Sequence, residues 1–127
     1  MAGQAFFPAQ APIEAYGNGG FRFADMSHRG SLLLLPTGIF GWDVASAEAL
    51  DVSDFARVLS GEPRIEFLLL GTGERQVRPA RAIRDAFSAA GIGLDPMDTG
   101  AAVRTYNVLL AERRLFGAAL IAVDRAS

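Results

Sequence analysis

The stretch that decides the fold is Ile65-Glu66-Phe67-Leu68-Leu69-Leu70-Gly71-Thr72-Gly73. It is a short apolar run that stops at a glycine turn, a pattern typical of a buried strand followed by a tight loop. A helix pattern follows over 79–90, and Ile92-Gly93-Leu94 then predicts a second strand, closed by the turn Asp95-Pro96-Met97-Asp98. Strand, helix and strand in this order form a right-handed parallel crossover. We therefore expect the loops 71–78 and 95–100 at the same end of a sheet.

The two helices around this second strand carry clear boundary signals. Pro79 suits a first-turn position and Gly91 suits the stop that follows the first helix. Asp98 or Thr99 is expected to cap the last helix, which runs to about Glu112. A final strand over 116–123 follows a turn, so we expect it to pair antiparallel to its neighbours.

The first 45 residues predict β-structure with tight turns. Candidate strands lie at 13–16, 21–23, 31–35 and 37–44, and Gly17-Asn18-Gly19-Gly20 is a strong turn signal. Short helices are expected at 46–50 and 53–59, capped by Ser46 and Ser53. The prediction is an α/β fold with a mixed, mostly parallel central sheet, helices and an additional N-terminal β layer. Residues 1–11 are expected to be a flexible arm, in which Phe6-Phe7 docks onto the domain, and 12–124 to be a single domain.

Composition excludes several kinds of chemistry. The chain has 127 residues, a net charge of −2, one histidine, no cysteine and no lysine. Thiolate nucleophiles, disulfides, Schiff-base lysines and multi-histidine metal sites are therefore impossible. We expect no cofactor and no metal. With no basic block, no nucleic-acid partner is expected. The lack of a signal peptide, a targeting segment or a membrane-spanning run favours a cytoplasmic protein.

The carboxyl ends of the predicted parallel strands are the candidate site, because open α/β sheets bind ligands beyond these ends. Glycine backbone and arginine side chains there suit a small anion or a peptide carboxylate. The alternative is a tight turn whose arginines pair with Glu74, Asp95 or Asp98. The predicted binding residues are Gly71, Thr72, Gly73, Arg75, Arg78, Asp98, Thr99 and Arg104.

Three weaker signals have structural explanations beside the functional ones. His28 with Asp25 or Asp43 is conceivable as a catalytic arrangement, but a single histidine near a turn is typical of a surface position. Asp95 and Asp98 are a possible carboxylate pair, or a strand-end residue and a helix cap. The aromatic residues form a partner surface if exposed and part of the core if buried; they are Phe6, Phe7, Phe40 and Trp42.

Three segments resemble one small domain family: Leu68-Leu69-Leu70-Gly71-Thr72-Gly73, Gly91-Ile92-Gly93-Leu94 and, most specifically, Asp98-Thr99-Gly100-Ala101-Ala102-Val103-Arg104-Thr105-Tyr106-Asn107-Val108-Leu109-Leu110. The family includes an archaeal protein of unknown function from Methanothermobacter and the mitochondrial NADH:ubiquinone oxidoreductase (complex I) assembly factor 3. The resemblance covers about 12–124 and implies a three-layer fold with a mixed central sheet.

The resemblance implies no established activity, cofactor or catalytic residue. It implies a non-catalytic adaptor or assembly factor for a membrane protein complex, plausibly respiratory complex I. Its partners would be complex I subunits or membrane-insertion machinery. The protein itself would be cytoplasmic and peripheral at the inner membrane. The alternative is a small-anion-binding domain or weak enzyme that uses the glycine loop and the arginines at the sheet edge.

Overall fold

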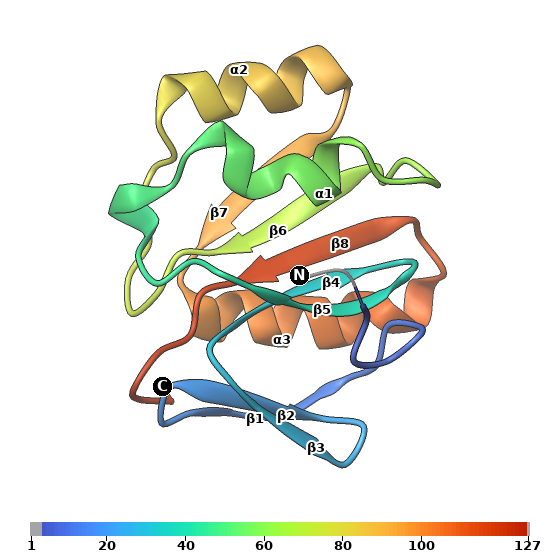
Figure 1. The fold of residues 1–127 in the computed structure, drawn as a ribbon, viewed down its shortest axis with the longest axis vertical. Coiled ribbons are helices and arrows are strands. Elements are labelled where there is room, and N and C mark those ends of the chain that lie inside the picture. Colours follow the sequence, from blue (N-terminus) through green and yellow to red (C-terminus); the bar gives the residue numbers. More distant parts are fainter. Residues whose placement is uncertain (1–3, 127) are drawn as a thin grey trace.

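The computed structural model describes residues 4–126, which form two sheets with helices packed around the larger one (Figure 1). The three-stranded sheet consists of β1 (Ile13–Gly17), β2 (Gly20–Phe23) and β3 (Met26–Arg29). The five-stranded sheet has the order β5-β4-β8-β6-β7. The mixed α/β class expected from the sequence is confirmed. Between residues 4 and 126, no helix combines the length and the apolarity needed to cross a bilayer.

The five-stranded sheet is half parallel, not mostly parallel as predicted. β6 (Phe67–Gly71) lies parallel to both β7 (Gly93–Met97) and β8 (Phe116–Leu120). β4 (Ser31–Leu35) pairs antiparallel with β8 and with β5 (Gly38–Trp42). The final strand is therefore antiparallel to one neighbour and parallel to the other, because it inserts between β6 and the N-terminal hairpin β4–β5.

Two helical crossovers bring the carboxyl ends of β6, β7 and β8 to one end of the sheet. α2 (Arg81–Ala90) connects β6 to β7 and ends at Gly91, whose φ of +71° is a left-handed helix stop. α3 (Thr99–Leu109) connects β7 to β8 and continues into a 3₁₀ turn, η3 (Leu110–Glu112). α2 and α3 lie on opposite faces of the sheet in Figure 1.

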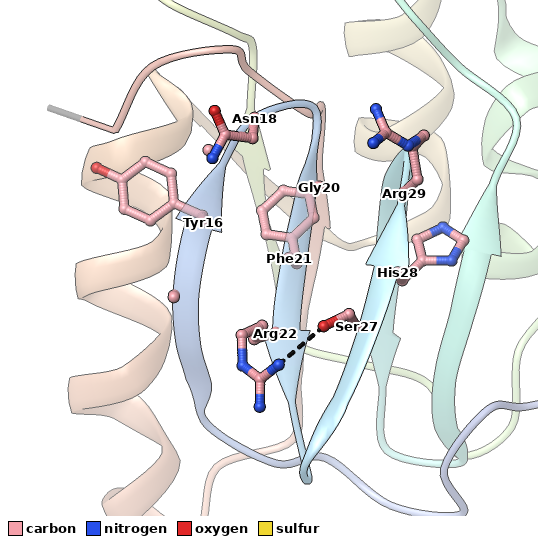
Figure 2. Close-up of a pocket in the computed structure, with 10 residues that line it drawn as sticks. Tyr16, Asn18, Gly20, Phe21, Arg22, Ser27, His28 and Arg29 are labelled. Atoms are coloured by element: carbon pink, nitrogen blue, oxygen red, sulfur yellow. Dashed lines mark hydrogen bonds between the residues drawn. The ribbon is translucent and has the colours of Figure 1, made fainter.

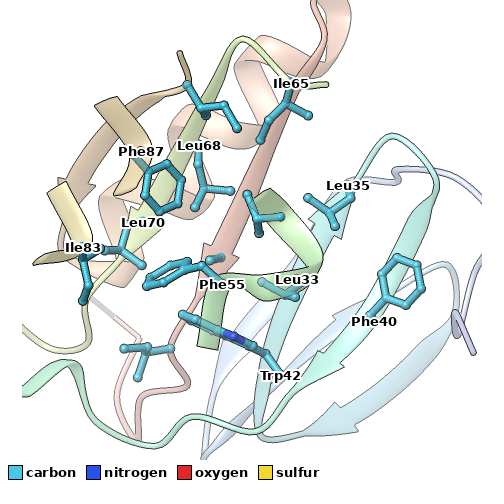
Figure 3. Packing of buried hydrophobic residues seen from close by; sticks show 14 of the residues in the cluster. Leu33, Leu35, Phe40, Trp42, Phe55, Ile65, Leu68, Leu70, Ile83 and Phe87 are labelled. Carbon is cyan, nitrogen blue, oxygen red and sulfur yellow. The ribbon is translucent and has the colours of Figure 1, made fainter. Parts of the chain in front are cut away.

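The face of the sheet under α2 carries an apolar core that also holds the short helices before β6. These are η1 (Ala47–Ala49), η2 (Val52–Phe55) and α1 (Ala56–Leu59). Phe55 lies between Trp42 and Phe87 in Figure 3, with ring centroids 5.5 Å and 5.2 Å away. The indole N–H of Trp42 donates to the carbonyl of Asp54 at 2.8 Å. Trp42 and Phe40 are 7% and 6% exposed, so they belong to the core and not to a partner surface.

The opposite face holds a second core between the sheet, α3 and the three-stranded sheet. Tyr106 and Asn107, side by side on α3, fasten the chain that enters β1. The buried Tyr106 hydroxyl donates to the carbonyl of Ala11 at 2.8 Å. Asn107 accepts from the N–H of Ile13 and donates to its carbonyl, both at 2.9 Å. The Tyr-Asn pair of the specific sequence motif is thus a clamp on the N-terminal strand.

Further bonds tie the N-terminal part of the chain to its C-terminal part. The side-chain amide of Gln10 donates to the carbonyl of Phe116 at 2.7 Å. The backbone N–H groups of Asn18 and Gly19 donate to the carbonyls of Asp124 and Val123, at 2.8 Å and 2.9 Å. The β1–β2 turn therefore lies against the segment that follows β8.

Part of the expected flexible arm runs along the edge strand β5. The N–H of Phe6 donates to the carbonyl of Ile39 at 2.7 Å, and the N–H of Ile39 donates to the carbonyl of Phe7 at 3.0 Å. Phe6 is 44% exposed, and Phe7 packs against the second core. Residues 1–3 of the expected arm lie outside the described residues.

Several predicted boundaries were wrong. β7 continues through Asp95-Pro96-Met97, which the sequence predicted as a turn, because Pro96 sits on an edge strand where a missing N–H disrupts no ladder. β3 occupies a segment that the sequence left as a turn. Asp51 and not Ser53 caps the second short helix, through a capping box with Asp54. Ala80 precedes α2, so Pro79 lies just outside the helix and not in its first turn.

Candidate functional site

The loops after β6 and β7 meet at the carboxyl ends of the parallel strands, as the sequence predicts. The N–H of Thr72 donates to the carbonyl of Met97 at 2.8 Å, and the N–H of Thr99 donates to the carbonyl of Gly73 at 2.8 Å. The N–H of Ile121 donates to the carbonyl of Gly71 at 2.9 Å. The ends of all three parallel strands are therefore linked to one another by backbone bonds.

Two buried threonine hydroxyls complete this network. Thr72 Oγ1 donates to the carbonyl of Arg75 at 2.7 Å and accepts from the N–H of Val77 at 3.0 Å. Thr99 Oγ1 donates to the carbonyl of Ile121 at 2.7 Å and accepts from the N–H of Gly73 at 3.0 Å. Thr72 is 5% exposed and Thr99 is fully buried. Both hydroxyls therefore bond to backbone groups of the loops and are not presented to a ligand.

The glycine turn serves close packing in the same way. A Cβ on Gly71 would lie 3.1 Å from both the Cα and the hydroxyl oxygen of Thr99. Gly73 has a φ of +108°, a conformation that other residues rarely adopt, and its Cβ position is open. The glycines thus let the loop pass close to the start of α3. Their N–H groups do not form a nest for an anion, since that of Gly73 already bonds to Thr99.

Beyond this network lies a cavity of about 640 Å³ with charged walls. Arg75 and three acidic residues line it: Glu48, Glu74 and Asp124. A hydrogen bond from the Ser46 hydroxyl is the main cause that lowers the pKa of the Glu48 carboxyl, and the charge of Arg75 acts in the same direction. Glu74 accepts from the backbone N–H groups of Asp124 and Arg125, at 3.2 Å and 3.3 Å. The lining of the cavity therefore carries three carboxylates and one arginine.

The remaining predicted residues lie away from this cavity. Asp98 caps α3 and accepts from the N–H of Ala101 at 2.8 Å. Arg104 lies on the exposed face of α3 and does not line the cavity. Arg78 lines a different hollow, between α2 and β7. Hydrogen bonds and close packing bring together Gly71, Thr72, Gly73 and Thr99. Arg75 lines the neighbouring cavity, while Arg78 and Arg104 lie on other parts of the surface.

A basic hollow on the outer face of the three-stranded sheet was missed by the sequence reasoning. Figure 2 shows Arg22 and Arg29 on neighbouring strands, with Arg22 Nη1 donating to Ser27 Oγ at 3.0 Å. The hollow measures about 440 Å³, and the small residue Gly20 lies in its wall. Arg22 alternates with the buried Phe21 and Phe23, so its outward position was readable. The hollow was missed because β3 was not predicted.

The histidine and the aspartates singled out in the sequence pack against a ring, lie exposed or cap a helix. The ring of His28 packs against Phe6, with centroids 4.9 Å apart. Asp95 lies exposed on β7, while Asp98 is the helix cap already described. Within residues 4–126 there is no group of three histidine or acidic side chains placed to hold a metal ion.

Comparisons with known proteins identify the relatives of this chain. A family model described as "Protein of unknown function (DUF498/DUF598)" matches residues 13–121. The NADH dehydrogenase [ubiquinone] 1 alpha subcomplex assembly factor 3 of Mus musculus is 34% identical over 93% of this chain and 64% of its own length. The chain thus spans slightly less than two thirds of that relative. The family resemblance read from the sequence is confirmed.

Two solved structures share the fold over nearly their whole length. A crystal structure titled as an outer membrane protein from Bartonella henselae is 52% identical, with a TM-score of 0.87, and the match covers 92% of this chain and 98% of that one. An NMR structure of a Rhodopseudomonas palustris protein is 46% identical, with a TM-score of 0.82, covering 97% and 93%. The arrangement of sheets and helices is thus shared with bacterial proteins.

Proposed function

This chain belongs to the DUF498/DUF598 family, and we propose that it is a non-catalytic assembly factor that binds proteins during the building of respiratory complex I. The observation that carries the proposal is the 34% identity to complex I assembly factor 3 across 93% of this chain. That span leaves little of the domain outside the match. The role proposed is therefore one that the domain performs as a whole.

The recognition surface in this proposal is the edge made by loops 71–78 and 95–104. Its backbone is held rigid by the Thr72 and Thr99 networks, so a partner would meet a surface that is already ordered. The cavity there carries both signs of charge, through Arg75 and the carboxylates of Glu48 and Glu74. Complementary charge of this kind selects a protein partner and speeds its approach.

The partners proposed are subunits of complex I or the machinery that inserts membrane proteins. A protein with this role would work from the cytoplasm, at the surface of the inner membrane. Arg75 and Arg104 are the proposed charge contacts, and the structure separates them, so each is tested alone as well as together.

The experiment is affinity purification of the tagged protein from gently solubilised membranes of its own host. Arg75→Ala, Arg104→Ala and the double variant are compared with the wild type. Arg114→Ala is the matched control, because Arg114 pairs with Glu66 at 3.1 Å near the amino end of β6, away from the loops. Loss of complex I or translocase subunits in the Arg75 or Arg104 variants, with retention in the control, is the expected result. A wild type that enriches neither class of subunit overturns the proposal.

The alternative, a small-anion-binding domain or weak enzyme at the same edge, receives less support from the acidic lining of the cavity. Thermal unfolding in inorganic phosphate separates the two functions. An upward shift of the melting temperature that disappears in Arg75→Ala would favour the anion site over the assembly role.

A further inference from the structure

A groove lies between α2 and the edge strand β7, and Gln76, Arg78 and Pro96 of loops 71–78 and 95–104 form part of its wall. It measures about 790 Å³, within the range of about 300–1,000 Å³ typical of ligand pockets. Its floor is apolar, formed by Phe87 of α2 and by Ile92 and Leu94 of the chain entering and forming β7. Arg78 and Arg84 also line the groove, and both are exposed.

The backbone of β7 is open on the side of the groove. Within the described residues β7 pairs with β6 alone and forms the edge of the sheet. The N–H of Gly93 donates to the backbone carbonyl of Glu66, and the carbonyl of Met97 accepts from the backbone N–H of Thr72. Alternate residues of β7 therefore direct their backbone groups toward β6. In a parallel ladder the residues between them, Leu94 and Pro96, turn their backbone groups outward.

The sequence limits how a strand can pair there. Pro96 has no N–H, and its carbonyl accepts from the side-chain amide of Gln76 at 2.9 Å. Leu94 therefore supplies the outward N–H and carbonyl available at this edge. A blunted edge of this kind resists open-ended sheet growth but leaves one residue able to pair with a short added strand.

The charge of the groove selects the sequence of that strand. Two arginines line the groove, and no acidic side chain is found among the described residues that line it. Arg84 is exposed and is held in place by a bond from its Nε to the carbonyl of Pro79 at 3.2 Å. Guanidinium groups bind carboxylates with two parallel hydrogen bonds.

We infer that the α2–β7 groove binds a short extended segment of a partner protein, which carries both apolar and acidic side chains at the alternate positions that face the groove. The segment pairs with the backbone of Leu94, its apolar side chains fill the space beside Phe87, and its carboxylates meet Arg78 and Arg84. Added strands of this type take affinity from main-chain bonds and specificity from alternate side chains. The groove is distinct from the Arg75 cavity and does not depend on the complex I assignment.

The test is a selection from a displayed library of random decapeptides against the full-length protein, followed by titration of enriched peptides into ¹⁵N-labelled protein. We expect peptides in which Asp or Glu stands two residues from Val, Ile or Leu, so that both face the groove, with amide shifts at Leu94, Gln76 and Ser88. Binding should fall at least tenfold in Arg78→Glu and in Arg84→Glu. Arg81→Glu, with the same charge change on α2 but outside the groove lining, should bind like the wild type.

A second comparison tests the backbone pairing without altering the protein. The enriched peptide is resynthesised with N-methyl groups at alternate residues, in both registers, and one of the two should lose binding. No enrichment, equal binding by the Arg78 and Arg84 variants, or shifts confined to the β1–β3 sheet would overturn the groove proposal. None of these outcomes bears on whether complex I subunits copurify, so the two proposals fail separately.

Discussion

Thr99 and Ile121 are joined by a buried hydrogen bond of 2.7 Å from the threonine hydroxyl to the isoleucine carbonyl. The same hydroxyl accepts from the N–H of Gly73 at 3.0 Å. One side chain at the start of α3 thereby holds the loop after β6 and the segment after β8. This oxygen and the Thr72 hydroxyl both contribute to the geometry of the proposed recognition edge.

Thr99→Val should destabilise the protein by about 1–3 kcal/mol, because an isosteric methyl leaves the N–H of Gly73 and the carbonyl of Ile121 buried without a partner. Urea unfolding measures the change. Thr99→Ser keeps the hydroxyl and should lose much less. Thr105→Val, on the partly exposed side of the same helix, is the control for valine in a helix. A Thr99→Val protein as stable as the Thr105→Val protein would contradict the role of the hydroxyl.

Asn107→Leu should cost about 1–3 kcal/mol through the loss of two hydrogen bonds to Ile13. The loss is local, so amide exchange at Ile13 should accelerate more than exchange at Leu69 in the centre of the large sheet. Hydrogen exchange followed by NMR measures both. Val108→Ala, at a neighbouring position that is 67% exposed, is the control and should leave exchange at Ile13 unchanged.

Tyr106 should make the protein sensitive to alkaline pH. Burial raises the pKa of its phenol above the ordinary value, so the folded state keeps a proton that the unfolded state releases above about pH 10. The contribution to stability is complete below pH 10 and is lost as the pH rises further, at up to about 1.4 kcal/mol per pH unit. The chain has no lysine or cysteine, and its other tyrosine is Tyr16, so few groups interfere in this range.

Tyr106→Phe is the variant that isolates this effect. At pH 7 it should be less stable than the wild type by about 1 kcal/mol, since the carbonyl of Ala11 loses its donor. Above pH 10 the wild type loses stability that the variant does not, so the difference should shrink or reverse. Free energies of unfolding between pH 7 and 11.5 measure it, and a constant difference would rule out titration of Tyr106.

Phe55→Ala should cost about 3–5 kcal/mol, because the ring is fully buried between Trp42 and Phe87. Trp42 is the single tryptophan, so its fluorescence reports on this core directly. The variant should unfold at lower urea and show red-shifted native emission. Phe6→Ala, which removes a ring that is 44% exposed, is the control and should cost about 1 kcal/mol or less.

Apolar runs and glycine turns were enough to predict the strands of the large sheet and the meeting of its two loops. The run Leu68–Leu70 is short, continuously apolar and followed by a glycine turn, which is typical of a buried strand, and Gly91 sets the end of α2. The path of β7 was not predictable locally, because Pro96 reads as a strand breaker unless the strand is known to lie at an edge. Edge position is a property of the assembled sheet.

The meeting of the two loops was predicted from the sequence, but the bonding of their side chains was not. Thr72 and Thr99 lie where the sequence placed them, yet their hydroxyls bond to backbone atoms. The acidic side of the cavity comes from Glu48 and Asp124, whose distance in sequence from Gly73 hides their proximity. The groove containing Arg78 and Arg84 needed the packing of α2 on β7, which periodicity does not specify.

The bonds that fasten the N-terminal part of the chain affect the order in which the protein folds during synthesis. The bonds from Gln10, Ile13 and Tyr106 join residues 94 to 106 positions apart, so they form only after α3 and β8 have been synthesised. Contacts this distant in sequence slow folding and expose apolar strands while synthesis continues. The segment that enters β1 is therefore fastened late, and a nascent chain that ends before α3 lacks the side chains that fasten it.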